Sequence, residues 1–207
     1  MYPYVKFLCL IKRSLTVDIL ALKKETNFTH LNLFSMRYRD TRDSEKSWIF
    51  ASRSNNPQPC AGNTPVPDAV VVVPFHIEKQ RLVIIREFRV PLGGYQYGFP
   101  AGLVDKGEKS VVAATRELWE ETGLTLVNVL RQSPPVYSSS GMTDESVSLV
   151  YAECQGEPST LANEASEDIE VIMLSKEDAA SLLNTPDLKF DVKTWIILST
   201  FATAGRI

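Results

Sequence analysis

Three carboxylates crowd little more than one helical turn in the segment RELWEE, where Glu117, Glu120 and Glu121 follow Arg116. Like charges four residues apart weaken a helix by about 0.2–0.5 kcal/mol, so this crowding requires a neutralising partner. Arg116 can hydrogen-bond to one of the acids in bidentate fashion and orient it. Considered alone, the segment also fits a solvent-exposed charged face, which is the usual role of acidic helix surfaces.

A divalent metal ion is the alternative partner for these acids. Hard cations such as Mg²⁺ take oxygen ligands, and several converging carboxylates supply them. A bound ion removes the repulsion, clamps a diphosphate and lowers the pKa of a bound water. The chemistry that this permits is attack of water on phosphorus, with loss of a phosphate-bearing leaving group.

The acids belong to the most strongly marked helix of the sequence, residues 110–122. A period of 3.6 residues puts Val111, Ala114 and Leu118 on one apolar face, which is expected to pack on a sheet. The carboxylates share an adjacent face, which looks out beside the loop GLVDKGE and its acid Glu108.

Residue preferences mark the ends of this helix and the other elements. Ser110 is expected to cap the first turn, and Gly123 stands where a left-handed residue ends a helix. Runs of β-branched residues predict strands over 31–40, 46–53, 69–75, 81–88, 125–132, 146–154 and 169–175. Two further helices are predicted over 176–184 and 188–204, and 91–102 is a loop with short extended pieces.

The order of these elements predicts an α/β (α+β) protein with two parts. Residues 58–207 form a mixed β-sheet sandwiched between helices, and residues 1–57 form a small antiparallel β element with a hairpin at TRDSE. The stretch NNPQPCAGNTPVPD links them. No strand is assigned to residues 1–30, because their hydrophobic residues alternate irregularly.

Composition narrows the class of protein. The 207 residues are 44% hydrophobic and carry a net charge of −3, so nothing indicates a surface for nucleic acid. Cys9, Cys60 and Cys154 are odd in number and far apart, which fits a reducing compartment. We expect no signal peptide, no membrane span and a cytoplasmic location.

The carboxylate helix and its preceding loop resemble the Nudix box of the Nudix hydrolase superfamily. The pattern is G-x5-E-x7-R-E-U-x-E-E-x-G-U, in which U is aliphatic. It is satisfied at nine positions: Gly102, Glu108, Arg116, Glu117, Leu118, Glu120, Glu121, Gly123 and Leu124. The resemblance implies the Nudix fold and catalysis with Mg²⁺ or, in its place, Mn²⁺.

Roles for the box residues follow from the resemblance. Glu117 and Glu121 are the principal metal ligands, and Glu120 is a further ligand or catalytic group. Glu108 and Arg116 are structural partners, and Arg116 is also one of the expected catalytic residues. The carbonyl group of Ala101 is another implied metal ligand.

Segments on either side of the box resemble the ADP-ribose pyrophosphatase branch. REFRVPLGGYQYGFPAG resembles the stretch that precedes the box, and it implies that Arg89 contacts the phosphate or terminal ribose of the substrate. A surface ion pair is the alternative for Arg89. Gly98 stands where many of these enzymes have glutamate, which leaves the sugar open. Tyr95 and Tyr97 are interpreted as loop packing.

Two later segments complete the implied site. SSSGMTDES resembles a substrate-contacting loop of the family, with Gly141 as the contact and Ser140 where proline is usual. ASEDIEV resembles the acidic loop that supplies a late carboxylate. Glu167 is the favoured base or additional metal ligand, and Glu164 is the second candidate. Both could instead be ordinary loop acids.

The N-terminal hairpin also fits this branch, whose members use it to pair two subunits and to stack a base. Trp48 takes the stacking position, and Phe50 shares its face of the strand. Burial of Trp48 in a dimer or domain core is the alternative. The resemblance thus implies a homodimer.

The resulting hypothesis is a Mg²⁺-dependent pyrophosphohydrolase that cuts ADP-ribose or a related nucleoside diphosphate sugar into nucleoside monophosphate and sugar phosphate. GDP-mannose, ADP-glucose and a dinucleotide are rival substrates. A non-catalytic Nudix-type ligand sensor is the alternative from another class. Hydrolysis of an RNA cap would need a basic groove, for which the composition gives no sign.

Overall fold

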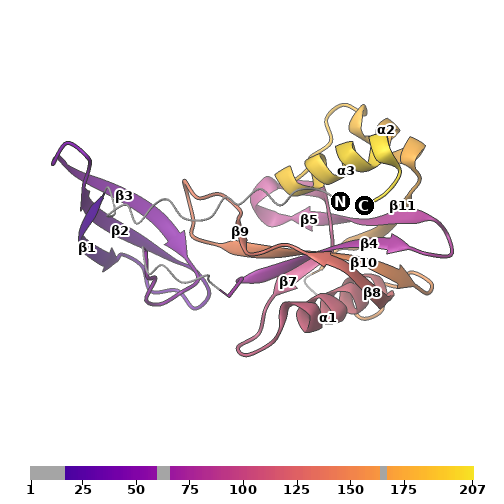
Figure 1. Cartoon of the computed structure of the whole chain (residues 1–207), viewed down its shortest axis with the longest axis horizontal. Coiled ribbons are helices and arrows are strands. Elements are labelled where there is room, and N and C mark those ends of the chain that lie inside the picture. Colours follow the sequence, from indigo (N-terminus) through magenta and orange to yellow (C-terminus); the bar gives the residue numbers. More distant parts are fainter. Residues whose placement is uncertain (1–16, 60–65, 164–166) are drawn as a thin grey trace, which may run out of the picture. The chain divides into compact units, whose positions relative to one another are not determined.

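A computed structural model describes residues 17–59, 66–163 and 167–207 (Figure 1). Three segments lie outside the described residues: 1–16, which contains Cys9, 60–65, which contains Cys60, and 164–166, which contains Glu164. The chain divides into two compact units. One comprises the described residues of Met1–Asn63 together with Ser139–Asp144, and the other comprises those of Thr64–Ser138 and Glu145–Ile207.

The N-terminal unit is a three-stranded antiparallel sheet in the order β1-β2-β3, which confirms the predicted N-terminal antiparallel element. Its strands are β1 (Asp18–Lys24), β2 (Asn32–Arg39) and β3 (Glu45–Ser52). The hairpin between β2 and β3 is closed by Asp40, whose Oδ1 accepts the amide hydrogens of Arg42 and Ser44. β1 had not been predicted, because a register irregularity between Ile19 and Ala21 interrupts its alternation.

The segment Ser139–Asp144 joins this unit through main-chain and side-chain hydrogen bonds to β3. The amide of Ala51 donates to the carbonyl oxygen of Met142 at 2.8 Å, and the Ser52 hydroxyl donates to Oδ2 of Asp144 at 2.8 Å. The N-terminal unit is therefore assembled from two stretches of chain that are far apart in sequence.

The second unit contains an eight-stranded mixed sheet. Its central order is β11-β5-β4-β10-β8, in which only β4 and β10 are parallel among the described strands. The strands are β4 (Ala69–His76), β5 (Arg81–Arg89), β6 (Gly94–Gly98), β7 (Ala101–Leu103), β8 (Thr125–Gln132), β9 (Val136–Tyr137), β10 (Ser146–Gln155) and β11 (Ile169–Leu174). A short 3-10 helix, η1 (Val90–Leu92), precedes β6.

Helices cover both faces of this sheet, as Figure 1 shows. Alternate residues of β4 explain the two layers, because successive side chains of a strand point to opposite faces. Val70 and Val72 pack in one core with Leu118 of α1 (Ser110–Thr122). Val71 and Val73 pack in the other core with residues of α2 (Lys176–Leu183) and α3 (Val192–Ala204). The predicted mixed sheet between helices is confirmed.

The ends of the helices differ in detail from the predictions. Ser110 is the first residue of α1 and not its cap, because Lys109 holds the extended N-cap conformation without a side-chain bond. Gly123 ends α1 in the left-handed conformation with φ +69°, as predicted. α3 begins at Val192 and not at residue 188, because Asp191 caps it by accepting the amide hydrogen of Thr194 at 2.9 Å.

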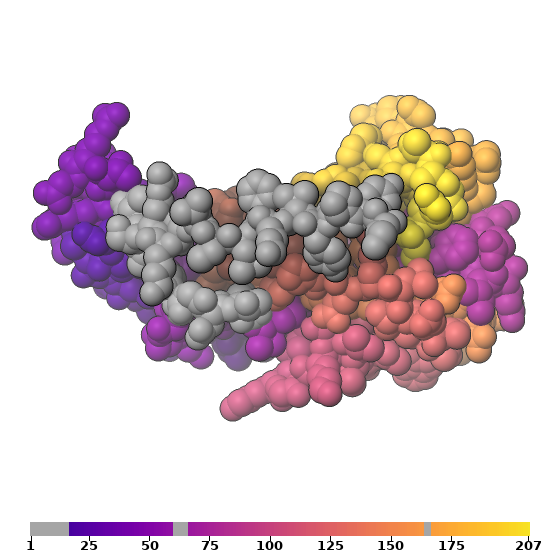
Figure 2. Space-filling view, in the orientation of Figure 1, coloured from indigo at the N-terminus to yellow at the C-terminus, as the bar shows by residue number. Residues whose placement is uncertain are grey.

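The faces of α1 are also rotated from the predicted arrangement. Val111 is 37% exposed, whereas Ala113 is fully buried beside Ala114. The apolar face therefore runs through Ala113, Ala114 and Leu118. The neighbouring carboxylates Glu117 and Glu121 are buried as a result of this rotation. On the opposite side of the sheet, the outer surface of α3 is visible in yellow in Figure 2.

Candidate active site

Arg116 of α1 is the centre of an ion-pair cluster. Its Nη1 donates to Oε1 of Glu117 at 2.6 Å and to Oε2 of Glu120 at 3.2 Å. Its Nη2 donates to Oε2 of Glu108 at 3.1 Å and to the carbonyl oxygen of Leu103 at 3.0 Å. One guanidinium thus joins three carboxylates and the end of β7, as its five fixed donors allow.

Glu108 fixes the loop that enters α1. Its Oε2 also accepts the amide hydrogen of Asp105 at 2.9 Å. The pKa of Glu108 lies below its usual value, chiefly because Arg116 donates to the charged carboxylate and secondly because the Asp105 amide does. The loop is therefore held by the ionised form of this acid.

Glu117 and Glu121 are buried, although both had been expected on a face that looks outward. Glu117 is 8% exposed and Glu121 is 5% exposed. Burial raises the pKa of Glu117, and the hydrogen bond from Arg116 opposes that rise. Gly102 makes room for this carboxylate, since a Cβ atom there would lie 1.9 Å from Oε1 of Glu117.

Glu121 is tied to β7 by the amide of Ala101, which donates to Oε2 at 3.1 Å. Burial raises the pKa of Glu121 to about 9, and the negative charges of Glu117, Glu87 and Glu167 add to the effect. An isolated buried carboxylate is costly, so this arrangement favours neutralisation by a proton or a cation. The amide of Ala101 contacts the site, while metal ligation by its carbonyl stays a prediction.

The residues present fit a hard divalent ion in donor chemistry, because Glu117, Glu120 and Glu121 all offer oxygen. Within the described ranges, no group of three or more His, Cys, Asp or Glu side chains is already placed so that it could hold a metal ion. Arg116 instead forms ion pairs with Glu117 and Glu120. A metal at this site would therefore compete with Arg116 for those carboxylates.

Glu87 of β5 is a site residue that the sequence analysis missed. Its side chain is 14% exposed and pairs with Nη2 of Arg89 at 2.9 Å. The pKa of Glu87 is raised by burial, against the effect of Arg89, and the charge of Glu167 adds to the rise. The segment REFR contains this acid, but only the pairing of β5 with its neighbours brings it near the α1 carboxylates. Arg89 is thus in an ion pair beside the site.

Glu167 lies directly before Asp168 and β11, and its charge acts on Glu87, Glu117 and Glu121. The structure therefore brings Glu167 into the electrostatic environment of the α1 carboxylates. Its role as base or ligand stays a prediction. Glu164 lies outside the described residues.

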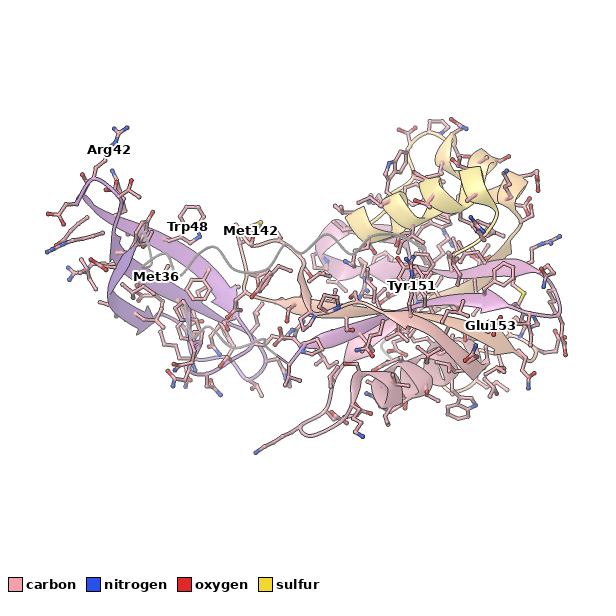
Figure 3. All side chains as sticks on the ribbon, viewed as in Figure 1. Met36, Arg42, Trp48, Met142, Tyr151 and Glu153 are labelled. Atoms are coloured by element: carbon pink, nitrogen blue, oxygen red, sulfur yellow. The ribbon has the colours of Figure 1, made fainter. Side chains whose placement is uncertain are left out.

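The remaining predicted contacts, Trp48, Phe50 and Gly141, belong to the N-terminal unit. Trp48 is 46% exposed and is paired with Met36 across β2 and β3; Figure 3 shows its side chain projecting from the sheet. Phe50 is buried, with its ring stacked on Phe34 at 5.7 Å between centroids. Gly141 is exposed in the turn closed by the Met142 amide and the Ser139 carbonyl. Their substrate contacts stay predictions.

A family model described as the NUDIX domain matches residues 65–195. An ADP-ribose pyrophosphatase of Saccharomyces cerevisiae is 29% identical over 133 residues, which cover 64% of this chain and 56% of that protein. A uridine diphosphate glucose pyrophosphatase of Mus musculus is 27% identical over 209 residues, which cover 83% of this chain and 88% of that protein. The chain spans about half the length of the first curated relatives that it matches.

One solved structure, described as an ADP compounds hydrolase, superposes with a TM-score of 0.69 at 21% identity. The superposition covers 93% of this chain and 97% of that one. At this identity the likeness concerns the fold, and it extends over both compact units of the described chain.

Proposed function

The chain belongs to the NUDIX domain family, and from this premise we propose that it hydrolyses the pyrophosphate bond of a nucleoside diphosphate sugar. ADP-ribose is the proposed substrate, and nucleoside monophosphate and sugar phosphate are the products. The names of the yeast and mouse relatives support this substrate class, since they refer to ADP-ribose and to uridine diphosphate glucose. GDP-mannose, ADP-glucose and a dinucleotide remain the alternative substrates.

The observation that carries the proposal is the pair of buried carboxylates Glu117 and Glu121 on α1. Arg116 pairs with Glu117, and burial makes it costly to ionise Glu121. A divalent cation would stabilise the ionised form of both buried carboxylates. We propose Mg²⁺, or Mn²⁺ in its place, held by Glu117, Glu120 and Glu121 with the Ala101 carbonyl and Glu167 as further ligands. Such an ion, when bound, supplies charge neutralisation for the diphosphate and acidity for the attacking water.

Residues of the chain supply the remaining parts of the proposed reaction. Arg89 contacts the phosphate or terminal ribose of the substrate. Glu87 orients the Arg89 guanidinium through their ion pair. Glu167 takes the proton of the attacking water, because a base needs only to lie within one water of the reacting atom. Arg116 keeps Glu117 and Glu120 together until substrate and ion arrive.

The N-terminal sheet has a proposed role in subunit pairing. Ile49 and Leu33 are exposed on one face of it, and Trp48 is exposed on the other. The face of Ile49 and Leu33 supports the proposed homodimer through residues 31–53. Trp48 and Gly141 contribute to the proposed base-binding surface, which the buried Phe50 supports on the face of Trp48. Light scattering that shows only monomer at working concentration would overturn the pairing. None of the helices in the described ranges is long and apolar enough to cross a membrane.

We propose a cytoplasmic location from the three widely spaced cysteines, which fit a reducing compartment.

The test is product release from a panel of ADP-ribose, ADP-glucose, uridine diphosphate glucose, GDP-mannose and a dinucleotide, with Mg²⁺, Mn²⁺ or chelator. We expect metal-dependent release of nucleoside monophosphate, and a loss of about 100-fold in Glu121→Gln, equal to ~2.7 kcal/mol of transition-state stabilisation. Turnover without metal, or full activity of Glu121→Gln, would overturn the mechanism. Binding of ADP-ribose without any turnover would indicate a sensor.

A further inference from the structure

Tyr95 of β6 connects the central sheet to the segment that carries Glu167. Its hydroxyl donates a hydrogen bond to Oδ2 of Asp168 at 2.5 Å. The pKa of Tyr95 lies above its usual value, chiefly because this hydrogen bond holds its proton. The interaction spans two stretches that are distant in sequence, and a charged acceptor makes it stronger than a neutral hydrogen bond.

Two side chains of β5 contact the ring of Tyr95. The guanidinium carbon of Arg86 lies 3.7 Å from the ring centroid, and the Phe88 ring meets it edge-on at 5.5 Å between centroids. Arg86 is held in turn by Glu170 of β11, with Nη1 donating to Oε2 at 3.2 Å. The hydroxyl of Tyr95 is therefore delivered by a ring that the sheet holds in place.

The main chain of Asp168 is bound at the same point. The amide of Phe88 donates to the carbonyl oxygen of Asp168 at 3.1 Å, at the start of the pairing between β5 and β11. Asp168 is thus held through its backbone and its carboxylate. Glu167 is the next residue toward the N-terminus, so these two bonds hold its main chain close to β5.

Glu167 has to reach carboxylates that come from other elements. Glu87 lies on β5, one residue before Phe88, and Glu121 lies on α1. The charge of Glu167 acts on both. A peptide segment free to leave β5 would carry Glu167 away from them.

We propose that Tyr95 is a positioning residue, whose hydrogen bond to Asp168 holds Glu167 at the reaction centre. The inference rests on the proposed function, in which Glu167 is the base. It assigns to Tyr95 a part in the reaction in place of simple loop packing.

The kinetic test compares Tyr95→Phe with the wild-type chain, because this change removes only the hydroxyl and keeps the ring contacts. We expect kcat for ADP-ribose to fall about tenfold with KM changed by less than about twofold, the pattern of an interaction used in the transition state. Asp168→Asn keeps an acceptor oxygen, so we expect its kcat to fall less than that of Tyr95→Phe. Tyr97→Phe, on the same strand with its ring stacked on Phe190, is the matched control and keeps wild-type kcat.

A double-mutant cycle separates positioning from general support of the fold. If Tyr95 acts through Glu167, Tyr95→Phe lowers kcat by less than about twofold in a Glu167→Gln background, since coupled residues are not additive. An equal tenfold loss in both backgrounds, or no loss in the wild-type background, would overturn the proposal.

Amide hydrogen exchange supplies a readout that does not depend on activity. Tyr95→Phe is expected to speed exchange of the Phe88 amide, which donates to Asp168, while Tyr97→Phe leaves it unchanged. Unchanged exchange at Phe88 would count against the proposal even in an active enzyme. A wild-type chain inactive on the whole panel would instead refute the proposed function.

Discussion

Gly102 of β7 lies directly against the carboxylate of Glu117 on α1. A Cβ atom at position 102 would be 1.9 Å from Oε1 and 2.0 Å from Cδ of Glu117. The carboxylate cannot move aside without cost, because it is buried and bound to Arg116 at 2.6 Å. The absence of a side chain at residue 102 therefore decides where a principal carboxylate of the site can stand.

Gly102→Ala is expected to displace the Glu117 carboxylate and to lower metal-dependent kcat/KM by about 100-fold, because small misplacements in a catalytic site have effects of that size. Steady-state kinetics with Mg²⁺ would measure the loss. Gly98→Ala is the control, since its Cβ atom would meet nothing nearer than Oδ2 of Asp191 at 3.8 Å. Equal activity of both variants would show that Glu117 is not held in its place by Gly102.

Arg116→Ala should destabilise the metal-free protein, because it leaves Glu117 and its neighbours without their cation. Removing one partner of a buried pair costs about 3 kcal/mol or more, and the partial exposure of Arg116 places this case at the lower end. Urea denaturation would measure the free energy of unfolding. Mg²⁺ should restore more stability to this variant than to wild type, since the carboxylates are released for binding.

Arg131→Ala provides a matched control for that experiment. The Arg131 guanidinium is exposed over the ring of Tyr151, away from the carboxylate cluster. Its loss should change stability little and should not alter the effect of Mg²⁺. A Mg²⁺ effect that is the same in wild type, Arg116→Ala and Arg131→Ala would contradict competition between the metal and Arg116.

Glu121 should make the stability of chelator-treated protein depend on pH. Its folded pKa, raised to about 9, lies above the unfolded value, so the folded protein keeps a proton that the unfolded chain releases. The resulting stabilisation is complete below about pH 4 and is lost as pH rises toward 9. Thermal denaturation across this range should show the Tm of Glu121→Gln rising relative to the Tm of the wild-type chain as pH increases. Glu78→Gln, a change at an exposed site, should show no such pH-dependent difference.

Glu87→Gln should weaken substrate binding through Arg89. The change removes the charge that orients Nη2 of Arg89 at 2.9 Å. We expect KM for ADP-ribose to rise about fivefold with kcat nearly unchanged, which is the signature of lost ground-state binding. In an Arg89→Lys background the same change should have a smaller effect. A fall in kcat at constant KM would instead place Glu87 in the metal or proton-transfer chemistry.

Local sequence was sufficient to predict the elements that are marked by a run of similar residues or by one residue with a strong conformational preference. The β-branched run at residues 69–75 predicted a buried strand, and β4 is buried on both faces. The left-handed end of α1 followed from Gly123 alone. The acidic cluster around Arg116 was predicted from residue types, because its members lie within or just before one helix.

The parts that sequence reasoning missed depend on contacts between distant segments. Burial of Glu117 and Glu121 follows from the rotation of α1 on the sheet, which Ala113 permits and the predicted Val111 face did not anticipate. Glu87 and Tyr95 join the site through the neighbours of β5. No periodicity along a single strand could have indicated either contact.

The two-part assembly of the N-terminal unit has a consequence for recombination between related genes. The chain passes from one unit to the other after residues 63, 138 and 144. A crossover near residue 63 would take β3 from one parent and Ser139–Asp144 from the other. The hydrogen bond from the Ser52 hydroxyl to Oδ2 of Asp144 would then form only if each parent carries its own half of the pair. Inheritance of this unit as a functional block therefore requires both stretches to travel together.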